Sequence, residues 1–462
     1  MMHHCSPVYE NNNISNLPSE KLFMKSSSTH NDVSSPIGVG VCGSFRRFFP
    51  GILSIVLLLS FLNARSQDTL SLKLPQADSL FLSKNLSLLS QQYNIDANEA
   101  LIIQAKSYPN PIFTADVNMV DPENEKIFHT DKTGQKAFAL EQLIILGGKR
   151  KVGIEIAKQN TILAQSEFAD LLRNLQRELR TTFFNLYQQR SVLEKYNRQL
   201  QLLDTLISSY DIQAKRGNVP MKDVIRLKSV YLKINNDKAE LASLHIEELK
   251  KIQILLQTPD YIMPVIDDAY FDQLSILKEY DELLDLAMAN RPDLKIAEEQ
   301  NDLSILNVKL QKKLAIPDVV ATTSYDQRGG AFQNQINAGI SIPLPLWNRN
   351  RGNLKAAEFY QKSSVAFQEQ TRMHVETDVQ GAWYNLIRSL NEYTKIKNIY
   401  TDDFDEVFQG VNTNFKKRNI NILEFVDFFE AYNESLAEFA RVKTQLAIAT
   451  GQINYVTGSK IY

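Results

Sequence analysis

Apolar side chains recur at seven-residue intervals over two long stretches of this chain. Leucine or isoleucine occupies every such position from Leu172 to Ile207, and apolar or aromatic residues do so from Val379 to Val407. Sustained heptads predict long helices that pack side by side at shallow crossing angles. Residues 150–215 contain no proline, and as one helix they would extend roughly 100 Å at 1.5 Å per residue. Such a helix exceeds the span of a single globular domain, so we expect an elongated protein.

Sequence landmarks return in the same order at a period of about 200 residues. Pro111 and Pro317 are 206 residues apart, and the run Lys215–Val219 returns as Lys416–Ile420 after 201 residues. In both halves a helical approach leads to two alternating segments, a glycine- or arginine-rich turn and a long helical region. This order predicts a duplicated unit.

Four segments alternate between apolar and polar residues. The alternation is clean in 112–119 and 337–344, and less so in 136–144 and 318–326. A period of two over eight to ten residues is typical of half-buried strands. We therefore predict strands at about 111–120, 136–145, 317–326 and 336–345.

Each half is predicted to be a strand hairpin carried on a helical hairpin, with the helices turning near 216–220 and 417–421. The expected boundaries are 67–257 for the first repeat with its hairpin at about 150–257, 258–277 for an equatorial linker, 278–457 for the second repeat with its hairpin at about 352–450, and 458–462 for a tail.

The N-terminal region has the pattern of an export signal. Arg46 and Arg47 precede the apolar run Phe48–Leu62, and the small residues Ala64 and Ser66 follow. This pattern predicts a signal peptide within residues 1–66 and cleavage before Gln67. The alternative, a membrane anchor, needs about 20 apolar residues to cross the hydrocarbon core, and this run has 15.

Charge and motif content point away from nucleic acid and from catalysis. The chain has 51 basic and 53 acidic residues, so no strong field favours nucleic acid. The run Gly147–Arg150 lacks the first glycine and the Ser or Thr of a phosphate-binding loop. His129, His245 and His374 lack the spacing of metal ligands. We expect no catalytic residue, cofactor or resident metal ion.

The four strands pose a problem that one chain cannot solve. Their length and alternation are those of strands in outer membrane barrels, whose smallest members have about eight strands. An open strand edge is not tolerated in the hydrocarbon region. If these strands span a membrane, several chains must pool them.

This organisation resembles the TolC-like outer membrane factor family over about 75–457, and is most similar to its CzcC branch, which is associated with heavy-metal efflux. The residues that carry the resemblance are Pro109–Pro111 and Pro317 at the entries to strands, Leu146–Arg150, Arg291–Leu294 and Ile342–Gly352.

The resemblance implies a mainly α fold with a small β part. Long antiparallel coiled-coil helical hairpins would form a periplasmic tunnel, and the four strands of each chain would contribute to a transmembrane β-barrel of a homotrimer in the outer membrane. It also implies a periplasmic adaptor and an inner-membrane pump of the RND type. The expected function is a passive efflux duct, with heavy-metal cations as candidate substrates. Two alternatives remain: a duct for type I protein secretion, and a soluble periplasmic coiled-coil scaffold.

The resemblance also implies a gate at the hairpin tips. In this family a tip glycine is followed by acidic residues that line the closed aperture. Gly217 matches the glycine and Asp223 follows it; in the second half Arg418 replaces the glycine, and Glu424 and Asp427 follow. In a trimer such acids would form a ring that favours cations. Alternatively, they stabilise the positive ends of their helices.

Glycine and basic residues mark the two turns from strand to helix. We assign the turns to Gly147 and Gly148 in the first half, and to Arg349 and Gly352 in the second. The neighbouring basic side chains are candidates for contact with lipid headgroups or for plain solvation; they are Lys149, Arg150, Lys151, Arg349 and Arg351. Trp347 beside them suits an aromatic side chain at the membrane interface or packing within the protein.

Overall fold

A computed structural model describes residues 69–267, 269–275, 278–329, 331–399 and 403–462. The chain divides into two units, residues 1–66 and residues 67–462. The expected signal peptide and N-terminal extension lie outside the described residues. The second unit is mostly helical and carries a four-stranded sheet.

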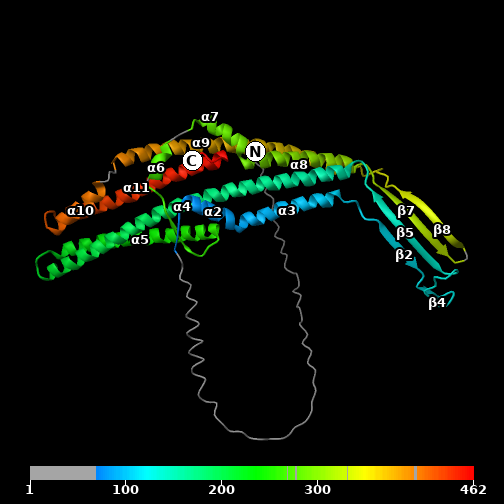
Figure 1. The fold of residues 1–462 in the computed structure, drawn as a ribbon, viewed down its shortest axis with the longest axis horizontal. Coiled ribbons are helices and arrows are strands. Elements are labelled where there is room, and N and C mark those ends of the chain that lie inside the picture. The colour runs from blue at the N-terminus through cyan, green and yellow to red at the C-terminus, as the bar shows by residue number, and fades with distance from the viewer. Residues whose placement is uncertain (1–68, 268, 276–277, 330, 400–402) are drawn as a thin grey trace, which may run out of the picture. The chain divides into compact units, whose positions relative to one another are not determined.

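Five long helices make up the two hairpins (Figure 1). The first hairpin consists of α4 (Lys149–Lys215) and α5 (Met221–Leu256). The second consists of α9 (Arg351–Ile399), α10 (Asp403–Lys416) and α11 (Ile422–Thr457). The 67 residues of α4 give a helix about 100 Å long at 1.5 Å per residue.

Shorter elements flank these hairpins. The shorter helices are α2 (Leu74–Lys84), α3 (Leu86–Lys106), α6 (Ala269–Asp272), α7 (Tyr280–Asn290) and α8 (Pro292–Leu314), and a 3-10 turn, η2, spans Gln273–Ser275. α3 packs on α4, and α8 packs on both α4 and α9. The strands β1 (Thr69–Leu72) and β6 (Tyr261–Pro264) form a separate parallel pair.

The heptad leucines of α4 supply part of the core. Leu179 and Leu186 are fully buried, against a cluster that includes Phe81 of α2 and Leu256 of α5. Burying one such side chain stabilises the fold by about 1.5–3 kcal/mol. Further along α4, the heptad residue Leu200 belongs to a second cluster shared with α5, α10 and α11. The heptad therefore holds both hairpins together. Among the described residues, no helix combines the length and hydropathy needed to cross a membrane.

Both halves of the chain contribute to one antiparallel sheet. Its order is β2 (Ile112–Val117), β5 (Gln135–Ile144), β7 (Val319–Arg328) and β8 (Phe332–Ser341). The central pair β5–β7 runs in continuous register from Gln135 opposite Arg328 to Ile144 opposite Val319. β2 and β8 are the edge strands. The loop between β2 and β5 contains a small hairpin of β3 (Val120–Asp121) and β4 (Lys126–Ile127).

Three strands differ by two residues or more from the sequence-based expectation, and β7 spans 319–328 instead of about 317–326. β2 ends at Val117 instead of about 120, and β8 spans 332–341 instead of about 336–345. The shift of β8 has a direct cause. Pro343 and Pro345 have no backbone N–H to donate, so the ladder ends before them.

The register separates an apolar from a polar face of the sheet. Because partners across a ladder share a face, Ala115, Phe138, Tyr325 and Ile336 lie on one face. The other residues of that face include Phe113, Val117, Leu140, Ala338 and Ile340. Phe138 stacks on both Phe113 and Tyr325, with ring centroids 6.2 Å apart in each pair.

The opposite face is mainly hydrophilic. It carries Thr114, Asp116, Glu141, Thr322, Ser324, Asp326, Gln335 and Asn337.

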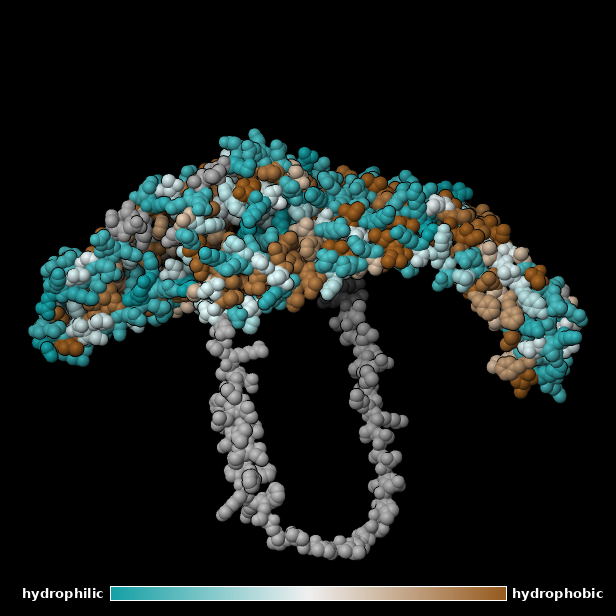
Figure 2. All heavy atoms as spheres, in the orientation of Figure 1, coloured by the Kyte–Doolittle hydropathy of each residue, from teal (hydrophilic) through white to brown (hydrophobic). Residues whose placement is uncertain are grey.

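The apolar face is open to solvent in the single chain. Its residues Ile336 and Ile340 are 80% and 74% exposed. Figure 2 shows hydrophobic residues open on the surface of the sheet and of the adjoining helix ends. The apolar face thus lacks a partner within the described chain.

Candidate functional site

The two hairpin turns lie together at the end of the helices that is remote from the sheet (Figure 1). Aromatic rings join them across the hairpins. Tyr210 of α4 stacks on Phe415 of α10 with centroids 5.6 Å apart, and Phe415 stacks on Phe425 of α11 at 4.1 Å. We call residues 210–223 and 415–427 the tip.

The two turns have the same hydrogen-bond pattern. In the first, the N–H of Asn218 donates to the carbonyl of Gln213 and the N–H of Gly217 to that of Ala214, both at 2.9 Å. In the second, the N–H of Asn419 donates to the carbonyl of Asn414 at 2.9 Å, and the N–H of Arg418 donates to the carbonyl of Phe415 at 3.0 Å. This pair of bonds is the Schellman motif, which ends a helix on a left-handed residue.

Arg418 occupies that left-handed position without being glycine. Its φ is 63°, beside 75° for Gly217. A side chain in this region costs roughly 1–2 kcal/mol. Arg418 replaces the glycine of the first turn, yet the hydrogen bonds of the second turn are the same. The turn is kept, at the expense of local strain.

The acidic residues differ in their local roles. Glu424 forms a capping box with Asn421: its N–H donates to Asn421 Oδ1 at 3.0 Å, and the N–H of Asn421 donates to Glu424 Oε2 at 3.3 Å. Such a box satisfies two free donors at a helix start. Within one chain, Glu424 therefore caps α11, whereas Asp427 is exposed one turn later.

Asp223 lies in the first turn of α5 and is half-buried. Burial raises the pKa of the Tyr210 phenol; the Asp223 carboxylate raises it further, and Arg418 lowers it. Charges from both hairpins therefore act on one ring at the contact between them.

The tip also carries a cluster of basic residues, and apart from Arg418 the sequence analysis did not assign them to this site. Its exposed members are Lys215, Arg216, Lys416, Lys417 and Arg418. Lys215 pairs with Asp211 at 2.7 Å. The repeated runs Lys215–Arg216 and Lys416–Arg418 were the available signal. The tip therefore combines acids near the helix starts with cations on the turns.

At the other end of the first hairpin, two glycines connect β5 to α4. Gly147 and Gly148 have φ values of 72° and 76°. A Cβ at Gly147 would lie 2.8 Å from Cδ1 of Ile316, whereas one at Gly148 would meet nothing within 4 Å. Gly147 is thus required by both backbone conformation and packing.

The second strand-to-helix turn uses a different residue from the one expected. Gly352 lies inside α9, in open space and without a positive φ. The left-handed residue is Asn350, with φ of 57°, and its amide donates to the Gln311 carbonyl at 2.9 Å. The assignment of the turn to Gly352 was wrong. Asn350 can hold the left-handed position because Asn tolerates this region and its side chain can form local hydrogen bonds. The side chain of Arg349 donates to the Pro345 carbonyl at 3.2 Å.

Lys149 is not available to lipid headgroups. Its ammonium is buried and lies 2.8 Å from Asp318 Oδ1, which also accepts from the Leu146 N–H at 2.9 Å. This pair connects the start of α4 to the start of β7. Arg150 lies over the Tyr108 ring at 3.8 Å, while Trp347 is 92% exposed.

The three histidines lie in separate environments. His129 is buried in the loop between β2 and β5, with Nδ1 2.5 Å from Asp121 Oδ2 and Nε2 3.0 Å from Thr133 Oγ1. His245 Nε2 lies 2.8 Å from the Tyr261 hydroxyl. His374 is exposed on α9. Within the described ranges, no group of three or more His, Cys, Asp or Glu residues could hold a metal ion.

Comparison with known proteins connects this architecture to a family. Residues 283–459 match the outer membrane efflux protein family. The similarity is thus to an outer membrane efflux protein domain. The domain begins in α7 and ends just after α11, so it includes β7, β8 and the second hairpin.

Individual proteins are similar to this chain over most of its length. The cobalt-zinc-cadmium resistance protein CzcC of Cupriavidus metallidurans is 22% identical over 391 residues, which are 84% of this chain and 90% of the relative. The CusC structure matches with a TM-score of 0.67 at 15% identity, over 84% of this chain and 92% of CusC. The CmeC outer membrane channel of Campylobacter jejuni matches with a TM-score of 0.66 at 13% identity, over 83% of this chain and 85% of CmeC. The fold is that of these channel proteins.

Proposed function

We propose that this chain is the outer membrane duct of a tripartite efflux system. The observation that carries the proposal is the four-stranded sheet, whose exposed large apolar side chains lie mainly on one face and whose acidic side chains lie on the other. A transmembrane barrel needs this division, with lipid outside and water inside. A soluble scaffold would instead have to expose Phe113, Ile336 and Ile340 to water.

Assembly follows from the two edges of that sheet. β2 and β8 each have one unpaired side, and unpaired backbone groups are not tolerated in hydrocarbon. If β8 of one chain pairs with β2 of the next, a homotrimer closes its strands into one barrel and leaves no edge. The helical hairpins of the three chains then continue the barrel as a tunnel into the periplasm.

The tip is the proposed gate and the contact point for a periplasmic adaptor, which would connect the duct to an inner-membrane pump of the RND type. The similarity to CzcC makes divalent heavy-metal cations the candidate cargo. Three copies of Asp223 and Asp427 around the trimer axis would attract cations in the pore.

One experiment tests location and assembly. The protein is extracted from isolated outer membranes and analysed by mass measurement in detergent. We expect extraction only with detergent, as a trimer. A monodisperse monomer that retains its strand content would contradict barrel closure.

A second experiment tests the cargo. A deletion strain is grown with graded cobalt, zinc and cadmium, with the intact gene restored as control. We expect lost metal tolerance that the gene restores. Unchanged tolerance together with failure to export a protein would instead identify a secretion duct.

Single-channel recording separates the two roles of the tip acids. Asp427→Ala removes an exposed charge that is not part of the α11 capping box, so we expect weaker cation selectivity with normal stability. Glu424→Gln retains an N3 side chain able to reach the Asn421 N–H and serves as the matched neutral variant. Selectivity unchanged in both variants would exclude these acids from the pore.

A further inference from the structure

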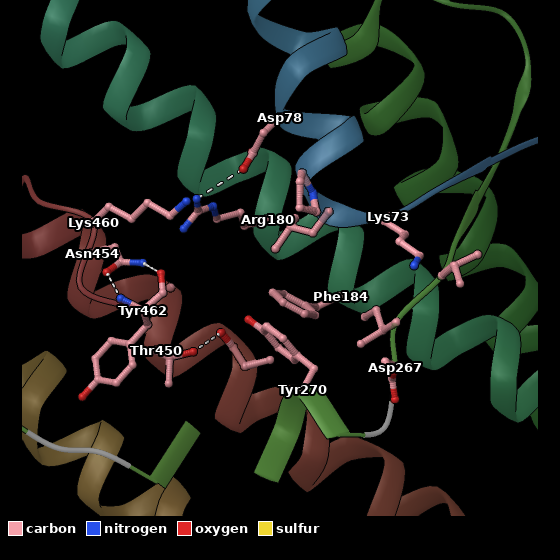
Figure 3. A pocket seen from close by; sticks show the side chains of 16 residues that line it. Lys73, Asp78, Arg180, Phe184, Asp267, Tyr270, Thr450, Asn454, Lys460 and Tyr462 are labelled. Carbon is pink, nitrogen blue, oxygen red and sulfur yellow. Dashed lines mark hydrogen bonds and ion pairs between the residues drawn. The ribbon is translucent and has the colours of Figure 1, made fainter. Parts of the chain in front are cut away.

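A cavity of about 330 Å³ lies within the helical part of the chain (Figure 3). Five segments line it: the start of α2, α4, the segment from β6 to α6, α11, and the C-terminal residues Lys460 and Tyr462 that follow α11. Its volume is at the lower end of the range for pockets that bind small molecules, about 300–1,000 Å³. Nothing in the proposed duct function uses this space.

One part of the cavity is apolar and aromatic. Leu74, Phe184, Ile266 and Tyr270 contribute to it. The rings of Phe184 and Tyr270 lie 5.7 Å apart at an interplanar angle of 27°. Burial raises the pKa of the Tyr270 phenol, as expected for a ring removed from water. This surface suits a flat or flexible apolar group.

The opposite part is polar and incompletely satisfied. A terminal guanidinium nitrogen of Arg180, Nη2, lies 3.3 Å from Asp78 Oδ2. Among the described residues, neither Arg180 Nε nor Asp78 Oδ1 has a hydrogen-bond partner, although both atoms are buried. Figure 3 shows Lys460 and Arg180 reaching the same end of the cavity. Buried polar atoms without partners are costly, so this end is prepared for another polar group.

A second cavity of about 530 Å³ shares this polar wall. Asp78, Arg180 and Lys460 line both cavities, and Arg173 and Arg177 extend the second. Basic side chains therefore outnumber acidic ones around the shared wall. A ligand that places a negative group there, with an apolar body against Phe184 and Tyr270, would match both the charge and the surface.

We propose that this cavity binds a small amphipathic anion, with its carboxylate at Arg180 and Lys460 and its apolar body against Phe184 and Tyr270. The inference is independent of transport, because every residue that it uses lies within one chain and away from the tip.

Phenylbutyrate is a suitable probe, and phenylbutanol is its uncharged counterpart. The full-length protein is transferred from detergent into amphipol and titrated with each by calorimetry. We expect saturable binding of phenylbutyrate and binding of phenylbutanol weaker by about tenfold or more. Equal binding of the two compounds would overturn the assignment of an anionic site.

Gly451 permits a selective block of the cavity. It lines both cavities, and a Cβ there would meet nothing within 4 Å. Gly451→Leu should fill the space without displacing the backbone and should abolish binding. Gly381→Leu is the matched control, since Gly381 is also a helical glycine in open space but lines neither cavity. We expect it to bind as the wild type does.

Lys460→Met tests the polar end without changing the cavity volume greatly. We expect phenylbutyrate binding to weaken by about tenfold while phenylbutanol binding is unchanged. If wild-type protein fails to bind phenylbutyrate, or if Gly451→Leu binds it as well as the wild type, the cavity holds water only and the proposal is wrong.

Discussion

Gly217 and Arg418 occupy the same position in two matching turns, and both have a left-handed backbone, with φ of 75° and 63°. Each N–H closes the same Schellman hydrogen bond. The duplicated halves therefore keep the geometry of the tip while replacing its glycine. The second turn can accommodate the side chain because Arg418 is exposed to solvent.

Replacing Arg418 by glycine should stabilise the protein. The backbone conformation is already left-handed, so Arg418→Gly relieves about 1 kcal/mol of strain. Gly217→Ala is the converse change and should destabilise by a similar amount. Chemical denaturation of the detergent-solubilised protein measures both. A loss of stability in Arg418→Gly would show that the arginine side chain makes a contact worth more than the strain.

The two strand-to-helix turns should respond differently to alanine. Gly147→Ala introduces a Cβ at 2.8 Å from Ile316 and strains a positive φ, so we expect a loss of at least about 1–2 kcal/mol. Gly352→Ala should be neutral or stabilising by about 0.5–1 kcal/mol, because Gly352 is helical. Thermal unfolding compares them. Equal losses would restore Gly352 as a turn residue.

The buried pair of Lys149 and Asp318 should be sensitive to loss of one partner. Lys149→Met leaves the Asp318 carboxylate without its cation, and breaking a buried pair costs about 3–5 kcal/mol. Because Asp318 is partly exposed, we expect the loss of unfolding free energy to lie at the lower end of this range. Lys151→Met alters an exposed neighbour and should change stability by less than about 0.5 kcal/mol. Similar effects of the two substitutions on unfolding would contradict a structural role for the pair.

Acid should loosen the loop between β2 and β5. The hydrogen bond from His129 is the main cause that lowers the pKa of Asp121 from 3.8 to about 2. A carboxyl group with a lowered folded pKa contributes stability above its unfolded pKa, and this contribution is lost as pH falls through the folded value. Pepsin cleavage within 118–134 should therefore increase between about pH 4 and pH 2. Asp121→Asn should be cleaved readily at both pH values; protection of this variant at pH 4 would exclude the Asp121–His129 contact as the cause.

The apolar face of the sheet predicts different outcomes for two neighbouring substitutions on β8. Ile340→Arg places a charge on that face and should cost about 2–4 kcal/mol if it lies near the bilayer midplane. Asn337→Arg faces the opposite side and should be tolerated. Both positions are exposed in the single chain, so the difference can arise only on assembly. Trimer yield in outer membranes measures it, and equal yields would contradict lipid contact by this face. Ile342, expected in the same apolar band, lies beyond the end of β8 and is left out of the comparison.

Features that depend on neighbours in sequence could be predicted from the sequence alone. The heptads indicated the long helices, and the alternation indicated the strands. These signals are local, because a side chain's face is set by its position in a period of 3.6 or 2 residues.

Tertiary structure decided which distant groups meet. The buried contact of Lys149 joins it to Asp318, 169 positions away, and the central ladder of the sheet pairs β5 with β7 from the other half of the chain. It also decided that Asn350 and Arg418 take the left-handed positions and that five segments enclose a cavity. No sequence period encodes such contacts, since each depends on the packing of whole elements whose order along the chain leaves their neighbours open.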